Sequence, residues 1–216
     1  MAEKNCIFCN HKLIEKEILW NYNNFFIKVG IGILGPGHIM LVSKKHISCF
    51  GELPEELKEE FKRIKEEVNK KVEDYFYKPI IFEQGAYGQS VNHAHLHFVP
   101  EQNDLYNLKN IKEKFSNHTQ RTEIKNILEI CKIFKEEGSY FYLEENGEKW
   151  IFHTKNLPEQ VLSFRKEFVK FTGLKELKDW RTMGEKEKKR NMEWVNKTKT
   201  IFKVAKNYKT LNSKKI

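Results

Sequence analysis

The stretch His93-Ala94-His95-Leu96-His97-Phe98-Val99 places three histidines at alternate positions in an apolar run. Side chains alternate between the two faces of a β-strand, so the three imidazoles would lie on one face of a sheet. Ala94, Leu96 and Phe98 would then point into the core. Because neighbouring imidazoles of the set stand roughly 6.5–7 Å apart along a strand, they suit separate tasks around one substrate better than a shared metal.

The alternative is a strand whose outer face is simply hydrophilic. With 8 histidines in 216 residues, chance would place three in this register about 0.01 times per chain, counting matches to the template. Neutral imidazole is both a nucleophile and a metal ligand, and its proton is mobile near neutral pH. The pattern therefore favours a strand that carries chemistry.

A glycine-containing loop joins this strand to a preceding apolar strand, Pro79-Ile80-Ile81-Phe82. The loop is Glu83-Gln84-Gly85-Ala86-Tyr87-Gly88-Gln89-Ser90-Val91. Glycine lets a backbone approach an anion closely, and successive amides in a turn can form an anion nest. Such a loop alone is typical of a hairpin connection. Beside the histidines, and with Gln89 and Ser90 as donors, it predicts a phosphate pocket opposite a nucleophile.

Near the start of the chain, Cys6-Ile7-Phe8-Cys9 spaces two thiols as in a zinc knuckle. A closed tetrahedral site needs two more ligands, for which His46 and His93 are the candidates. The alternatives are a redox dithiol, which would lack the usual βαβ surroundings, and a pair without function. Cys49 and Cys131 are isolated, which indicates small buried hydrophobes.

The sequence shows neither a signal peptide nor an apolar run of membrane length. We therefore expect a cytoplasmic protein with reduced thiols and no membrane partner.

The triad, the Gly88-Gln89-Ser90 run and the stretch from Gly37-His38 to Lys45-His46-Ile47 resemble the histidine-triad family of nucleotide hydrolases and transferases. The resemblance covers roughly residues 5 to 100. It implies that His95 attacks the α-phosphorus of a nucleoside phosphate derivative. It further implies that His97 and His38 line the phosphate site, and that Ser90 bonds a phosphoryl or leaving-group oxygen.

The same resemblance implies a metal site and an assembly. In zinc-bearing members, the first triad histidine joins the cysteine pair and the later strand histidine. For this chain the resemblance thus implies a structural zinc held by Cys6, Cys9, His46 and His93. A homodimer is expected from edge-to-edge or helix-mediated pairing of two triad sheets.

Two positions depart from the family's pattern. Members that hold a ribose usually place an acidic or amide side chain eight residues before the first strand histidine, where this chain has Gly30. The phosphate-contacting amide before the glycine loop falls on Glu83, with the loop one residue shorter. A carboxylate repels phosphate unless it is protonated or paired with a cation. These departures suggest one alternative function, a binding module without turnover.

The whole pattern predicts an α+β fold, with a mainly antiparallel five-stranded triad sheet and a covering helix. Strands are expected at 18–20, 25–29, 38–43, 79–83 and 93–99, and an amphipathic helix at 54–75. This triad domain would span 1–101. The extension, 102–216, is expected to combine helices with a β-hairpin.

In the extension, helices are expected at 108–115 and 122–136. Strands 140–143 and 150–153 flank Glu145-Asn146-Gly147-Glu148, a good hairpin turn. A further helix is expected to begin near Pro158 and to end before Gly173. We expect these elements to pack as a second layer against the triad sheet and to form a wall of the substrate cleft.

The formal net charge is +9, and positive charge concentrates at the end of the chain. A basic surface attracts nucleic acid, but a solvated helix face explains the charge equally well. Trp180-Arg181 is a more specific candidate for phosphate or nucleotide binding, because arginine forks a phosphate and tryptophan offers a stacking face. Arg165 has the same capacity, and either arginine could instead close a structural ion pair.

These observations predict a hydrolase or nucleotidyl transferase that cleaves a nucleoside phosphoanhydride or phosphoramidate through a covalent phosphohistidine. A nucleic-acid end-processing enzyme of the aprataxin type is the enzymatic alternative. The basic C-terminus favours it, whereas the missing C-terminal Cys/His finger opposes it.

Overall fold

The structure, a computed structural model, describes residues 5–30, 32–101, 109–158, 161–173, 175 and 179–212. Of residues 109, 110, 171, 180 and 205–212 it describes the backbone alone.

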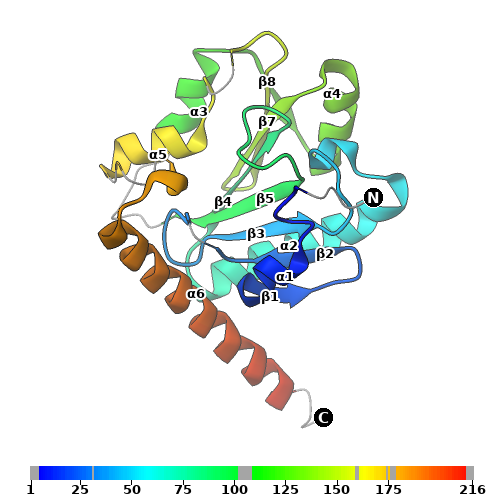
Figure 1. Ribbon diagram of the computed structural model, residues 1–216. Coiled ribbons are helices and arrows are strands. Elements are labelled where there is room, and N and C mark those ends of the chain that lie inside the picture. The colour runs from blue at the N-terminus through cyan, green and yellow to red at the C-terminus, as the bar shows by residue number, and fades with distance from the viewer. Residues whose placement is uncertain are drawn as a thin grey trace.

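Five strands form the first part of an antiparallel sheet (Figure 1), and every expected strand is present within two residues of its predicted ends. In spatial order they are β1 (Ile18–Asn21), β2 (Phe25–Lys28), β3 (Ile39–Ser43), β5 (His95–Pro100) and β4 (Pro79–Gly85). Strand β5 begins at His95 rather than His93. The reason is that the amides of His93 and Ala94 bond to Val91 and Ile47, outside the strand ladder.

Helix α2 (Lys58–Tyr75), which follows the 3₁₀ turn η3 (Glu55–Leu57), covers one face of this sheet. Its inward side chains are fully buried against Ala94, Leu96 and Phe98, so the predicted core face of the triad strand is confirmed. Full burial of an aliphatic or phenyl side chain contributes about 1.5–3 kcal/mol. The core residues of α2 are Phe61, Ile64, Val68 and Val72.

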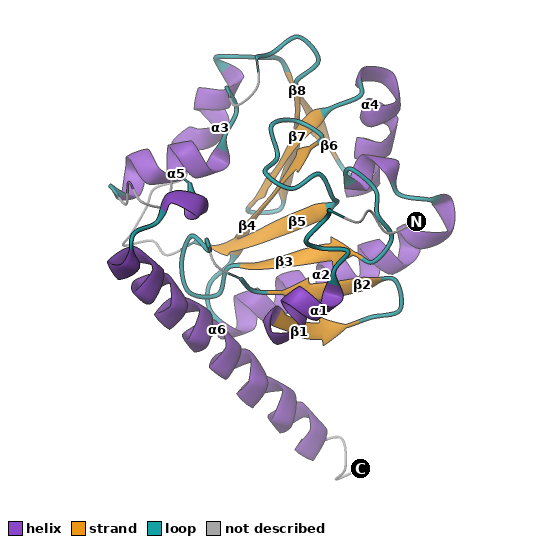
Figure 2. Ribbon diagram, viewed as in Figure 1, coloured by secondary structure: helices purple, strands orange, loops and turns teal. Residues whose placement is uncertain are grey.

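The strands of the extension continue the same sheet instead of joining a second layer, which corrects that part of our expectation. Strand β7 (Tyr140–Glu145) pairs with β4, β8 (Glu148–His153) pairs with β7, and β6 (Arg121–Ile124) pairs with β8. The result is an eight-stranded sheet, β1-β2-β3-β5-β4-β7-β8-β6 (Figure 2). An edge strand has a row of unpaired backbone groups, and β7 satisfies those of β4.

The prediction of a helix at 122–136 is wrong for the first residues of that range. Residues Arg121–Ile124 form β6, and the helical segment begins only at η4 (Ile127–Glu129) and continues as α4 (Ile130–Glu137). The cause is a capping box, in which Asn126 Oδ1 accepts from the Leu128 amide while Glu129 Oε1 accepts from the Asn126 amide. The hairpin is confirmed, with Asn146 and Gly147 at positive φ in its turn.

Helices α3 (Lys109–Ser116) and α5 (Phe164–Thr172) cover the face opposite α2, against Phe82, Val99 and Phe141. Helix α5 begins six residues after Pro158, because the Ser163 hydroxyl caps it, and it ends at Thr172, before Gly173, as predicted. The shorter helical segments among the described residues include α1 (His11–Ile14), η1 (Glu15–Glu17), η2 (Phe50–Glu52) and η6 (Trp180–Thr182).

Helix α6 (Glu185–Asn212) packs beside β1 at one end of the sheet (Figure 1). None of the helices in the described ranges combines the length and apolar character that a membrane span requires.

Candidate functional site

A pocket of about 250 Å³ opens on the face of the sheet opposite α2. His38 precedes β3, His95 and His97 lie on β5, and Ser90 belongs to the glycine loop. All four line the pocket, so the structure brings the predicted catalytic residues together. They meet because alternate residues of β3 and β5 face the same side, with Met40 opposite His97 and Val42 opposite His95.

The imidazole of His95 is held in one tautomer by the backbone. Its Nδ1 lies 2.6 Å from the carbonyl oxygen of His93, which can only accept a hydrogen bond. Nδ1 therefore carries the proton, and Nε2 keeps its lone pair. Burial is the largest cause that lowers the pKa of His95, to about 4, so the ring is neutral near neutral pH. A neutral imidazole with a free Nε2 is a nucleophile.

His38 and His97 form a directional pair beside it. The Leu34 amide donates to His38 Nδ1 at 2.9 Å, so the ring proton of His38 lies on Nε2. His38 Nε2 lies 2.9 Å from His97 Nδ1 and donates to it, which leaves the proton of His97 on Nε2. Burial lowers the pKa of both rings well below the usual value, and the positive charge of Arg165 adds to the effect. His97 is thus a neutral N–H donor.

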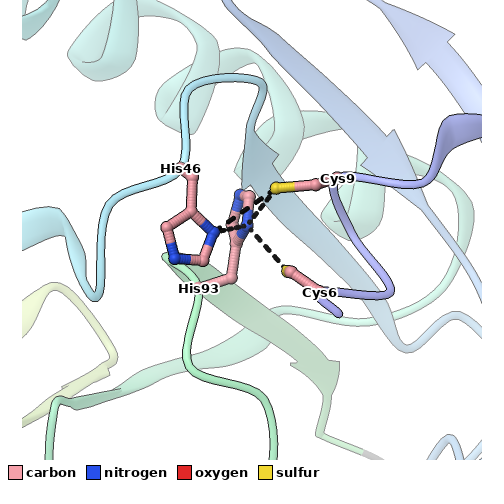
Figure 3. A group of neighbouring side chains, drawn as sticks. All are labelled: Cys6, Cys9, His46 and His93. Atoms are coloured by element: carbon pink, nitrogen blue, oxygen red, sulfur yellow. Dashed lines mark hydrogen bonds between the residues drawn. The ribbon is translucent and has the colours of Figure 1, made fainter. Parts of the chain in front are cut away.

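A second cluster gathers the four predicted metal ligands (Figure 3). Cys6 and Cys9 come from the N-terminal segment, His46 from the loop after β3, and His93 from the residues just before β5. Their ligand atoms all lie within 4.8 Å of one another. His93 Nε2 donates to the Ser43 carbonyl at 2.7 Å, which leaves Nδ1 facing the two sulfurs.

The spacing of this cluster fits zinc. With Zn–N and Zn–S bonds of about 2.05 and 2.3 Å, a tetrahedron separates two nitrogens by about 3.3 Å and a nitrogen from a sulfur by about 3.6 Å. The two Nδ1 atoms of His46 and His93 are 3.2 Å apart. His93 Nδ1 lies 3.3 Å from Cys6 Sγ and 3.6 Å from Cys9 Sγ, and His46 Nδ1 lies 3.4 Å from Cys9 Sγ. Two thiolates and two imidazoles are also a common ligand set for structural zinc.

Glu83 does not contact the pocket, and this placement corrects its assignment as a phosphate contact. It faces the α2 side of β4, where it accepts from the Phe50 amide and the Tyr140 hydroxyl. Burial raises the pKa of Glu83 to about 7. The next residue, Gln84, lines the pocket instead, because alternation puts it on the same face as Phe82 and His97.

Among the described residues, Gly88, Gln89 and Arg181 are not part of the pocket lining. Gln89 donates to Ser48 O and Asn92 Oδ1, and Gly88 turns the loop with a φ of +58°. Arg181 is exposed and forms a two-point ion pair with Asp179. The side chain of Trp180 lies outside the described residues.

Two pocket residues have charges that the motifs do not explain. Lys28, on the triad face of β2, forms an ion pair with Glu17 at 2.8 Å, and both line the pocket. Gly30 lies against this pair. A Cβ added at Gly30 would come within 2.7 Å of both Glu17 Oε2 and Lys28 Nζ, so a side chain there would push the ends of these two flexible side chains aside. The alternation of β2 is a signal that could have placed Lys28 on this face.

The extension holds the pocket loop between β2 and β3. From α6, Asn191 accepts from the Gly32 amide and donates to Ile33 O, while Thr198 accepts from the Gly37 amide. From α5, Arg165 donates to Gly32 O at 2.6 Å and lines the pocket. Sequence reasoning missed Asn191 and Thr198, because no local pattern links residues about 160 positions apart to this loop.

A family model described as the HIT domain matches residues 13–104. An uncharacterised HIT-like protein of Methanocaldococcus jannaschii is 34% identical over 102 residues, which are 44% of this chain and 78% of that relative. The chain belongs to the HIT family. The histidines of both clusters lie within residues 13–104. Arg165, Asn191 and Thr198 lie beyond that range.

Three solved structures similar to this HIT protein each match less than half of its length. A hypothetical histidine triad nucleotide-binding protein of Sulfolobus tokodaii is 21% identical, covering 44% of this chain and 68% of its own, with a TM-score of 0.40. A zinc-bound histidine triad family protein of Mycobacterium smegmatis is 20% identical, covering 46% and 76%, with a TM-score of 0.37. A HIT family hydrolase of Clostridium thermocellum is 27% identical, covering 46% and 92%, with a TM-score of 0.38.

Proposed function

We propose that this HIT protein cleaves a phosphoanhydride or phosphoramidate bond of a nucleotide by double displacement on His95. The observation that carries the proposal is the hydrogen bond from His95 Nδ1 to His93 O, which leaves the Nε2 lone pair available in the pocket. A binding module would not need its central histidine held as a free base.

In the first step, His95 Nε2 attacks phosphorus, an N–P bond forms, and the bond from phosphorus to the leaving group breaks. The leaving group departs with the bonding electron pair and takes up a proton from water, while His95 keeps its Nδ1 proton on the bond to His93 O. In the second step, water or another acceptor attacks phosphorus and releases a proton to solvent, and the N–P bond breaks, which returns His95 to its neutral form. His97 Nε2–H and the Ser90 hydroxyl serve as donors to phosphoryl or leaving-group oxygens.

The Cys6, Cys9, His46 and His93 cluster is proposed to hold a structural zinc. When bound, the ion would tie the N-terminal segment and the loop after β3 to the residue that begins the triad. Those residues also set the position of the His93 carbonyl, which orients His95.

The test is detection of the covalent intermediate. The full chain is incubated with adenosine 5′-phosphoramidate or a diadenosine polyphosphate, and the digest is examined by mass spectrometry under non-acidic conditions. We expect a nucleotidyl adduct on the peptide that contains His95. The exposed His118 provides the control. His118→Ala should retain the adduct and His95→Ala should lose it.

Absence of any adduct together with unchanged nucleotides would overturn the proposal. An adduct formed only from the 5′ end of a nucleic acid would support the aprataxin-type alternative instead.

The expected homodimer and cytoplasmic location stay predictions. Because β7 occupies the second edge of β4, two triad sheets cannot pair through that edge. A homodimer would have to use β1, β6 or a helical surface. Light scattering at micromolar concentration should give twice the chain mass of 25.9 kDa, and a mass near 26 kDa would contradict the dimer.

A further inference from the structure

The loop between β4 and β5, which carries Ser90 into the pocket, is anchored on the extension through Tyr87. The Tyr87 side chain is buried, with 4% of its surface exposed. Its hydroxyl donates to Pro158 O at 2.6 Å and accepts from the Val161 amide at 3.1 Å and the Leu162 amide at 3.4 Å. One hydroxyl thus binds three backbone groups of the segment that leads into α5.

The backbone of this loop depends on such an anchor. Ala86 and Gly88, on either side of Tyr87, have positive φ angles of +59° and +58°. Alanine rarely adopts this left-handed conformation, which persists only where the surrounding contacts enforce it. Gln84, a pocket residue, adds a second restraint, because its Nε2 donates to Tyr87 O at 3.2 Å and to Gly88 O at 3.4 Å. The position of Ser90, two residues after Gly88, therefore depends on these contacts.

A second set of contacts links the start of α5 to His97. The Phe82 ring lies nearly parallel to the His97 ring, with centroids 4.4 Å apart and an angle of 8° between the two planes. Phe164, the first residue of α5, stacks on Phe82 with a centroid distance of 4.2 Å and an angle of 15°. Both phenylalanines are buried. Three near-parallel rings, linked through Phe82, therefore connect α5 to the pocket.

The ring stack supplies a restraint that the hydrogen bond to His97 does not. The bond from His38 Nε2 fixes where His97 Nδ1 points, but the ring could still tilt about that bond. Contact with the flat face of Phe82 sets the plane of the ring, and with it the direction of the His97 Nε2–H donor. A donor stabilises a transition state best when it is already aimed before the charge develops.

We propose that Tyr87 and Phe164 are positioning residues of the catalytic centre. Tyr87 holds Ser90 at the pocket through the loop, and Phe164 holds the ring plane of His97 through Phe82. This inference rests on the proposed function and adds to it. Both proposed donors to the phosphoryl or leaving-group oxygens are then set by one segment beyond residues 13–104, the range that the HIT model matches.

Steady-state kinetics of the full chain test the positioning role, with whichever of adenosine 5′-phosphoramidate and a diadenosine polyphosphate it turns over. Tyr87→Phe deletes one oxygen atom, and Phe164→Leu removes the ring that stacks on Phe82. In each variant kcat should fall by about 10–100-fold, since a misplacement of about 1 Å can cost about 10²-fold. KM should change little, because neither side chain lines the pocket.

Two matched variants control for the loss of the same atoms elsewhere. Tyr77→Phe removes a hydroxyl from an exposed tyrosine. Phe115→Leu shortens a buried phenylalanine of the same core cluster, whose ring makes edge-to-face rather than stacked contacts. Both controls should keep kcat close to the natural value. Thermal unfolding shows which variants fold, and Phe164→Met, which keeps more of the side-chain volume, replaces Phe164→Leu if that variant does not fold.

A measurement without turnover tests the His97 ring directly. The ring current of Phe82 should shift the signals of the carbon-bound imidazole protons of His97 upfield in nuclear magnetic resonance spectra, and the spectrum of His97→Ala assigns those signals. Phe164→Leu should move them, whereas Phe115→Leu should leave them in place.

Unchanged kcat in folded Tyr87→Phe would overturn the role of Tyr87. Unchanged kcat, or unmoved His97 signals, in folded Phe164→Leu would overturn the role of Phe164. The adduct on His95 separates these failures from failure of the proposed function. An adduct together with unchanged kinetics in both variants refutes the positioning residues alone. Absence of adduct and turnover in the natural protein refutes the proposed function, and with it the catalytic part of the positioning role.

Discussion

His93 and His95 lie two residues apart in one segment, yet backbone carbonyls select opposite nitrogens on the two rings. His93 donates from Nε2 to Ser43 O and presents Nδ1 to the cysteines. His95 donates from Nδ1 to His93 O and presents Nε2 to the pocket. The same side chain thus becomes a metal ligand or a nucleophile according to which ring nitrogen meets a carbonyl.

The two clusters also differ in their surroundings. The Cys6, Cys9, His46 and His93 cluster is closed, because four ligand atoms face one another. The pocket around His95 is open, and its wall includes Arg165 and Lys28. The first arrangement suits a structural ion, and the second leaves room for a substrate. If the two clusters are independent, a substitution in one of them should leave the other intact.

The largest effect is expected for His95→Ala. Turnover should fall by about 10⁴-fold or more, because removing a nucleophile leaves only binding and the neighbouring donors. The cysteine cluster should still bind its metal, since His93 is unchanged. Steady-state kinetics would measure the turnover, and metal analysis of the same sample would measure the bound metal. Loss of metal together with activity would show that the triad histidines share the ion.

Cys6→Ser should act on the other cluster. We expect zinc content to fall from about one ion per chain to near zero. The free energy of unfolding should fall by about 4 kcal/mol when free zinc exceeds its Kd about 1,000-fold. Cys131→Ser, which changes a thiol outside the cluster, is the control. Unchanged metal content in Cys6→Ser would contradict the zinc assignment.

His38→Ala should reduce kcat less than His95→Ala does, by about 10²–10³, the typical cost of losing one preorganised donor. The reason is that His38 Nε2–H fixes the tautomer of His97 and touches the reaction only through it. His97→Ala should fall in the same class. A loss as large as that of His95→Ala would assign His38 a more direct role.

Glu83→Gln tests the face of the sheet away from both clusters. Burial raises the pKa of Glu83 to about 7, above its ordinary value of 4.5. The folded protein therefore binds more protons than the unfolded chain between those values, and the free energy of unfolding falls as pH rises through that window. This group accounts for about 3 kcal/mol of the fall.

The Glu83→Gln variant should lose correspondingly less stability between pH 5 and 8, as urea unfolding at each pH would show. Parallel pH profiles of the two proteins would refute the raised pKa.

Asn191→Ala is expected to have the smallest effect. It leaves the buried Gly32 amide and Ile33 carbonyl without their side-chain partner, at a cost of about 1–3 kcal/mol of stability. Turnover should also fall, because the same loop positions the Leu34 amide that orients His38. Asn196→Ala, on the exposed face of the same helix, is the matched control. Equal effects of the two variants would contradict a role of Asn191 in positioning the pocket loop.

Much of the site could be predicted because its signals are local. The alternation of His93, His95 and His97, the CxxC spacing and the glycine loop each lie within a few residues. Alternation also predicted the buried face of β5, which the packing of Leu96 and Phe98 confirms. Element boundaries were less accurate where a cap decided them, as at Asn126 and Ser163.

The sequence by itself determined which residues carry the chemistry and which face of β5 they occupy, since strand periodicity is a property of neighbouring residues. Only the tertiary structure decided that β7 completes the edge of β4 and that Gln84, not Glu83, faces the pocket. It also decided that Arg165 from the extension enters the pocket. These outcomes depend on strand pairing and packing between segments far apart in the chain, and local composition does not encode them.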